Sequence, residues 1–156
     1  MLTRCLATLV MVVAALAGAA RDVEAQARPI VYVIPIEGMI DMGLAPFVQR
    51  TLTEASRANA AAVILEINTF GGRVDAAVVI RDALLSSPLR TVAFVNRRAI
   101  SAGALISLAS EKIAMADGGT VGAATPVQAG APGATPGAVE EKSVSYLRSE
   151  FRATAD

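Results

Sequence analysis

The order of the apolar runs constrains the possible fold of this chain more than any other feature of the sequence. Short runs rich in β-branched residues alternate with segments whose apolar residues recur at helical spacing. The predicted strands cover residues 31–36, 62–67, 91–95 and 113–115, and the predicted helices between them cover 44–55, 75–85 and 102–108. This repeated order predicts an α/β domain with a mainly parallel sheet. The run 62–67 is apolar enough that we expect a strand covered on both faces of the sheet.

The C-terminal part of the chain has a different composition. Residues 118–137 are almost entirely Gly, Ala, Pro, Thr and Val, which predicts a mobile loop. Residues 140–152 then place Val144, Leu147 and Phe151 on one stripe and predict a short amphipathic helix. Lys142 lies on the opposite side of that helix from the stripe.

The N-terminus has the pattern of an export signal. Arg4 precedes an apolar stretch over residues 6–20, which is followed by small residues typical of a cleavage site. We predict a signal peptide over 1–27, with an uncleaved anchor as the alternative, because a membrane span needs about 20 apolar residues. The expected location is the periplasmic or extracytoplasmic face of a membrane. Residues 28–156 would form one domain, without a disulfide because Cys5 is the only cysteine.

Composition excludes several classes of function. The chain has 14 basic and 14 acidic residues and no histidine. No basic stripe is visible, so nucleic acid is not an expected partner. Without histidine, and with one cysteine, the chain lacks zinc ligands, and we expect neither metal nor cofactor. Its glycines match neither a phosphate loop nor a dinucleotide fingerprint.

Two glycine- or serine-centred turns carry the candidate chemistry. Gly71 and Gly72 follow the strand 62–67, and Ser101 follows the strand 91–95 and opens a helix of small residues. Turns of this type supply a nucleophile and backbone N–H groups for an oxyanion. Because a Ser-His-Asp triad is impossible without histidine, the candidate bases are the two lysines, Lys112 and Lys142.

Each candidate also has a purely structural interpretation. Ser101 is a favourable N-cap for the helix that follows it. Gly71 and Gly72 suit any turn that needs positive φ. Lys142 on an exposed helix is compatible with an ordinary surface charge, and Lys112 occupies an ordinary position just before a strand.

Three segments resemble a known family. Residues 68–72 (Asn-Thr-Phe-Gly-Gly), 99–103 (Ala-Ile-Ser-Ala-Gly) and 122–126 (Gly-Ala-Ala-Thr-Pro) are similar to the N-terminal protease domain of NfeD-type membrane proteins, which are ClpP-class serine proteases with a Ser-Lys dyad. The resemblance runs from about Ile30 to the C-terminus and implies a ClpP/crotonase-like spiral of β-β-α units, C-terminally incomplete. It also implies that Ser101 is the nucleophile and Lys142 the general base.

The resemblance implies further roles. The oxyanion would be held by the N–H of Ala102 and one of those of Gly71 and Gly72, and Gly103 would let a substrate backbone approach. Phe70 stands where the family has proline, and we interpret it as part of the substrate groove. The implied substrate is an apolar peptide or a stomatin-like membrane protein, and the implied assembly is a homodimer or larger oligomer.

Three other functions remain open from the residues. The chain is also compatible with a non-catalytic fragment or scaffold of an NfeD-type protein. A signal-peptide-peptidase-like protease shares the dyad and much of the fold. A crotonase-type acyl-CoA enzyme shares the fold and a two-amide oxyanion hole, but its chemistry does not need Ser101 and Lys142 together.

Overall fold

Four parallel strands form the centre of the fold, in the order β1-β2-β3-β4 across the sheet. The computed structural model describes residues 28–124 and 141–155. The strands are β1 (Val31–Ile40), β2 (Ala62–Gly72), β3 (Thr91–Ile100) and β4 (Lys112–Met115), and β5 (Thr120–Gly122) pairs with β3 beyond the end of β4. The predicted α/β class with a mainly parallel sheet is confirmed.

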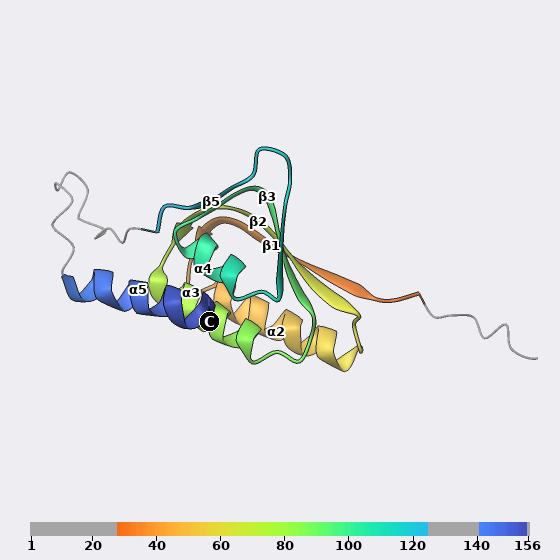
Figure 1. Cartoon of the computed structure of the whole chain (residues 1–156). Coiled ribbons are helices and arrows are strands. Elements are labelled where there is room, and N and C mark those ends of the chain that lie inside the picture. Colours follow the sequence, from red (N-terminus) through yellow and green to blue (C-terminus); the bar gives the residue numbers. More distant parts are fainter. Residues whose placement is uncertain (1–27, 125–140, 156) are drawn as a thin grey trace, which may run out of the picture.

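Helices connect the strands and cover one side of the sheet. They are α2 (Leu44–Arg57), α3 (Val74–Leu85), α4 (Ala102–Leu108) and α5 (Glu141–Ala155). The structure does not describe residues 125–140, which precede α5. Figure 1 shows these helices together on the concave side of the curved sheet. The predicted helix 102–108 coincides with α4, and the predicted strand 113–115 extends by one residue in β4.

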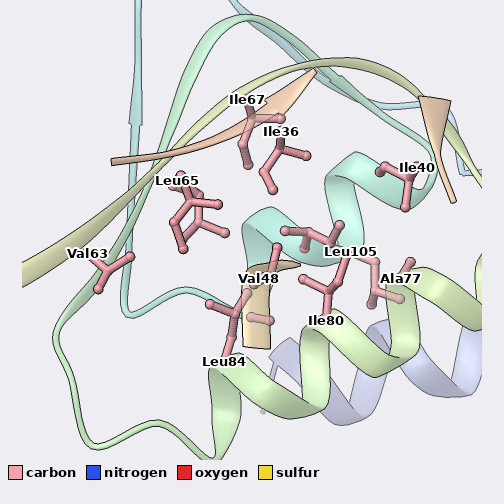
Figure 2. Packing of buried hydrophobic residues seen from close by; sticks show 14 of the residues in the cluster. Ile36, Ile40, Val48, Val63, Leu65, Ile67, Ala77, Ile80, Leu84 and Leu105 are labelled. Atoms are coloured by element: carbon pink, nitrogen blue, oxygen red, sulfur yellow. The ribbon is translucent and has the colours of Figure 1, made fainter. Parts of the chain in front are cut away.

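The core lies between the sheet and these helices. Alternate residues of β2, namely Val63, Leu65 and Ile67, are completely buried, as are Ile34 and Ile36 of β1. Figure 2 shows the side chains of Ile36, Val63, Leu65 and Ile67 facing residues from the three connecting helices. Val48, Ile80 and Leu105 are labelled among those helical residues. Every second residue of the strands and one face of each helix therefore pack together in one apolar cluster.

The opposite face of the sheet corrects one expectation. Val31 and Val33 of β1 are 45% and 55% exposed, and Ile113 of β4 is 43% exposed. Intervening residues of β2 such as Ile64 are only half-buried. The expectation that the strand 62–67 is covered on both faces is wrong for the part of the chain that the structure describes, because its helices all pack on the same face.

Two further expectations need correction at the strand ends. The segment predicted as a loop over 118–137 contains β5, whose main chain pairs residue by residue with Arg98, Ala99 and Ile100 of β3. Residues 125–137 of that predicted loop lie outside the described residues. Gly71 and Gly72 do not follow β2 as a turn but form its last two residues, paired with β1.

Helix α5 is held against α3 and α4 by apolar and ionic contacts. Leu147 is 4% exposed and Phe151 packs against the core cluster. The Arg81 guanidinium of α3 contacts the Glu150 carboxylate at 3.2 Å and donates from Nε to Thr154 Oγ1 at 2.8 Å. Within residues 28–124 and 141–155, no helix combines the length and apolar character needed to cross a bilayer.

Candidate active site

Ser101 occupies a strained turn between β3 and α4. Its φ of 54° and ψ of −116° lie in a sparsely populated region for a residue with a side chain, which costs about 1–3 kcal/mol. Its N–H donates to Gly122 O of β5 at 2.8 Å, and its own carbonyl accepts from Ala104 N–H at 2.9 Å. Its side chain makes no capping hydrogen bond to the helix. The backbone is therefore fixed on both sides, while the hydroxyl is not used as an N-cap.

Gly71 lies directly against this turn. Its φ is +104°, and a Cβ atom added to it would lie 2.7 Å from Ser101 Cβ and 3.2 Å from Ala102 N. A side chain at position 71 would thus collide with the serine and approach the first amide of α4. The fold brings the two sequence motifs together, since both stand at the carboxyl ends of neighbouring parallel strands.

The two glycine amides have different surroundings. Gly71 N–H donates to Thr69 Oγ1 at 2.9 Å. Ile40 O, whose residue pairs with Gly72, accepts from Arg73 N–H at 2.8 Å. Because successive N–H groups of a strand point to opposite sides, the Gly72 N–H points away from β1, toward the side of β3 and α4.

Thr69 is a buried residue of the site that the sequence analysis missed. It is 1% exposed, and its Oγ1 donates to Gly38 O of β1 at 2.5 Å while accepting from Gly71 N–H. A Cβ added to Gly103 would lie 2.5 Å from Thr69 Cγ2, so Gly103 is buried against this side chain. The alternation of buried residues at Val63, Leu65 and Ile67 continues at Thr69, and this pattern could have predicted that Thr69 is buried.

A hollow of about 870 Å³ opens above Ser101 at the ends of β1, β2 and β3. Gly71 and Gly72 line it together with Ser101, as does Phe70, which is 73% exposed. Ala102 and Gly103 are buried behind the turn. The remaining lining residues are Gly38, Met39, Asn68, Thr69, Arg97, Arg98, Ile100 and Ala123.

Neither lysine lies in this hollow. Lys142 is exposed in the first turn of α5 and is not among the lining residues. The Leu147 and Phe151 side of α5 faces the core of this chain, which leaves Lys142 on the outer side. Lys112 pairs with Val92, nine residues before Ser101 on β3, or roughly 25–30 Å along a strand. The described residues do not bring either lysine next to Ser101.

The charges beside the hollow are mainly arginines. Arg98 Cζ lies 4.4 Å from the centre of the Phe70 ring, a cation–π contact. Farther along, at the start of α3, the Arg73 guanidinium lowers the pKa of the Asp75 carboxyl from its ordinary value. In the described part of the chain, no three His, Cys, Asp or Glu residues gather where they would hold a metal ion.

Comparison with known proteins places this chain in a family. The family described as NfeD1b, N-terminal domain, matches residues 30–156. The membrane protein NfeD1b of Bacillus subtilis is 48% identical over 94 residues, which cover 60% of this chain and 22% of the relative. The membrane-bound protease PH1510 of Pyrococcus horikoshii is 38% identical over 104 residues, 65% of this chain and 24% of the relative. The chain thus spans less than a quarter of the length of these curated relatives.

Solved structures support the same assignment. A serine-to-alanine mutant of the 1510-N membrane-bound stomatin-specific protease has a TM-score of 0.75 at 32% identity, covering 83% of this chain and 64% of that one. A lysine-to-alanine mutant of that protease, in complex with a substrate peptide, has a TM-score of 0.76 at 32% identity, covering 83% and 60%. The chain therefore belongs to the NfeD1b N-terminal domain family and has the ClpP-like fold of this protease domain.

Proposed function

We propose that this chain is a serine endopeptidase domain in which Ser101 attacks a peptide carbonyl. The observation that carries the proposal is the strained Ser101 turn, which is packed against Gly71 and lines an open hollow. Backbone strain at a serine whose hydroxyl does not cap its helix is typical of a functional site. The relatives include a membrane-bound protease, which supports the same reaction class.

The proposed reaction is acyl transfer through a covalent intermediate. Ser101 Oγ forms a bond to the peptide carbonyl carbon while Lys142 accepts the hydroxyl proton. The C–N bond then breaks, and the leaving amine takes that proton. A water molecule, deprotonated by Lys142, attacks the acyl-enzyme and releases the second product with regeneration of Ser101.

The oxyanion would be stabilised by backbone amides around the turn. The proposed donors are the Ala102 N–H and one glycine N–H. Because the Gly71 N–H is bonded to Thr69 Oγ1 and the Gly72 N–H points toward β3 and α4, the arrangement favours Gly72 as the second donor. Loss of one such donor typically costs about 2.7–4 kcal/mol of transition-state stabilisation.

The role of Lys142 rests on the family resemblance. A general base must come within about 2.6–3.2 Å of the proton it abstracts, directly or through one water molecule. Lys142 is exposed on α5 outside the hollow, so approach of its amine to Ser101 is itself part of the proposal. This placement also favours a second candidate, a non-catalytic scaffold domain in which Ser101 and Lys142 never meet.

The cellular setting is proposed on the same basis. We place the domain at the extracytoplasmic face of a membrane, after export by residues 1–27, because the relatives are membrane proteins. The proposed substrate is an apolar peptide segment or a stomatin-like membrane protein, since a solved relative is described as stomatin-specific. Homodimer formation is proposed as the assembly that completes the site.

Hydrolysis of quenched fluorescent apolar peptides by the purified chain tests the proposal. Wild type and Lys112→Ala are expected to cleave, whereas Ser101→Ala and Lys142→Ala are expected to lose nearly all activity with unchanged circular dichroism. Lys112 is the matched control, because it lies near the opposite end of β3. Cleavage by a well-folded Ser101→Ala chain would disprove the serine mechanism, and a folded wild type without any activity would support the scaffold.

A further inference from the structure

Among the residues that the structure describes, the hollow above Ser101 has basic side chains and no acidic ones. Arg97 and Arg98 both line it, and none of the described residues that line it is Asp or Glu. Elsewhere in the described chain, Arg73 and Arg81 each contact a carboxylate within 4 Å, but no such pair forms at Arg97 or Arg98. Two arginine residues therefore line the space that a substrate would occupy.

Arg98 is held in place on both of its sides. Its backbone lies in β3 and pairs with Thr120 of β5, three residues before Ser101. Its guanidinium stacks 4.4 Å from the centre of the Phe70 ring, which projects from β2. A stacked guanidinium loses less side-chain freedom when it binds a ligand, because its orientation is already fixed.

A second, smaller hollow of about 420 Å³ shares these walls. Phe70, Arg97, Arg98 and Ile100 line both hollows. Of the described residues that line it, Asp117 alone is acidic; it is exposed and forms no ion pair with either arginine within 4 Å. The two arginines thus line both hollows, and an extended peptide bound at Ser101 could continue past them into the smaller one.

We propose that the site selects peptide segments in which a carboxylate side chain, Asp or Glu, lies close to the apolar residues around the scissile bond. Arg98, fixed by Phe70, is the specificity-determining residue, and Arg97 adds charge beside it. A guanidinium binds a carboxylate through paired, charge-assisted hydrogen bonds, which a neutral amide matches poorly. This inference rests on the proposed peptidase function and adds the chemical class of its substrate.

An anionic lipid surface offers similar charge but fits the geometry less well. The two arginines line a concave hollow together with Ser101, a shape that suits a peptide side chain better than the flat surface of a bilayer. A peptide side chain can enter it. The experiment therefore includes lipid as a separate arm.

Binding of peptides to the Ser101→Ala chain separates recognition from catalysis. The probes are fluorescein-labelled apolar Leu-Val-Ala peptides, identical except for one Glu, Gln or Lys, measured by anisotropy at low and high salt. We expect the Glu peptide to bind about tenfold more tightly than the Gln peptide, with a smaller ratio at high salt. In the Ser101→Ala background, Arg98→Glu should reverse the order in favour of Lys. Arg50→Glu on the exposed side of α2 is the matched control and should leave the order unchanged.

The outcomes separate this inference from the peptidase proposal. Equal binding of the Glu and Gln peptides overturns the inference, even if the wild-type chain cleaves both. A Glu preference that Arg98→Glu reverses supports it, even if nothing is cleaved, in which case only the peptidase proposal fails. Arginine-dependent sedimentation with phosphatidylglycerol but not phosphatidylcholine vesicles, without a peptide preference, overturns it in favour of a lipid contact.

Discussion

Replacement of Gly71 by alanine tests the packing that joins the two halves of the site. The φ of +104° is unfavourable for alanine and costs about 1–3 kcal/mol. The new Cβ would lie 2.7 Å from Ser101 Cβ and 2.9 Å from Ile100 O, and such overpacking costs about 1–3 kcal/mol more. We expect Gly71→Ala to lower the free energy of unfolding by about 2–6 kcal/mol, a large part of a typical domain's stability.

Gly38→Ala is the matched control for this substitution. Gly38 also has positive φ, +69°, but a Cβ there would meet nothing within 4 Å. It should therefore show the conformational cost alone, about 1–2 kcal/mol. The excess cost of Gly71→Ala over Gly38→Ala measures the contact with the Ser101 turn.

Urea denaturation followed by circular dichroism gives both values, provided that the slope of the unfolding free energy stays unchanged. Combining Gly71→Ala with Ser101→Gly removes one of the two colliding Cβ atoms, so the double mutant should recover part of the loss. If Gly71→Ala costs no more than Gly38→Ala, or if Ser101→Gly brings no recovery, the close approach of Gly71 to Ser101 is wrong.

Three further predictions concern the support of the site. Gly103→Ala should lower the free energy of unfolding by about 1–3 kcal/mol, because the added Cβ would lie 2.5 Å from Thr69 Cγ2. In urea denaturation, Thr69→Ser should reduce this loss, since it removes Cγ2, and an equal loss with Thr69 or Ser at this position would contradict the contact. Arg81→Ala should lower the free energy of local opening of α5 by about 1.5–3 kcal/mol, because its contacts with Glu150 and Thr154 are lost. This change should appear as faster amide exchange over residues 141–155, and Arg50→Ala should leave that exchange unchanged. Arg73 lowers the pKa of Asp75 below its ordinary 3.8, so the stability from this pair is present above that pH and is lost as the pH falls through the lowered pKa. In Asp75→Asn, the free energy of unfolding should therefore fall less steeply as the pH is lowered. If its dependence on acid pH is the same as in the wild type, the Arg73–Asp75 pair does not contribute to stability.

Much of the fold follows from local patterns. The boundaries of α4 and the positions of the four main strands are readable because apolar spacing reports which face of each element is buried. The meeting of Gly71 with Ser101 also follows, since adjacent parallel strands end at the same edge of the sheet. Gly71 is additionally marked by its glycine identity, which its positive φ and its close approach to Ser101 both require.

The remaining features depend on contacts that no local pattern reports. Strand β5 has only three residues, which is too short for a periodic pattern of apolar side chains to reveal a strand. The open face of the sheet has apolar residues like those of the covered face, and periodicity cannot tell which face the helices choose. The position of Lys142 depends on how α5 docks through Leu147 and Glu150, a long-range arrangement.

Fluorophosphonate labelling of the purified chain, with the adduct located by peptide mass spectrometry, tests most directly whether Ser101 is a nucleophile. A fluorophosphonate reacts with a serine hydroxyl only where that hydroxyl is activated as a nucleophile. If Ser101 is the nucleophile, an adduct forms on Ser101 of the folded wild-type chain, but not on Ser101→Ala and not after denaturation. A folded wild-type chain without an adduct on Ser101, or with an adduct on another serine that persists in Ser101→Ala, would contradict it.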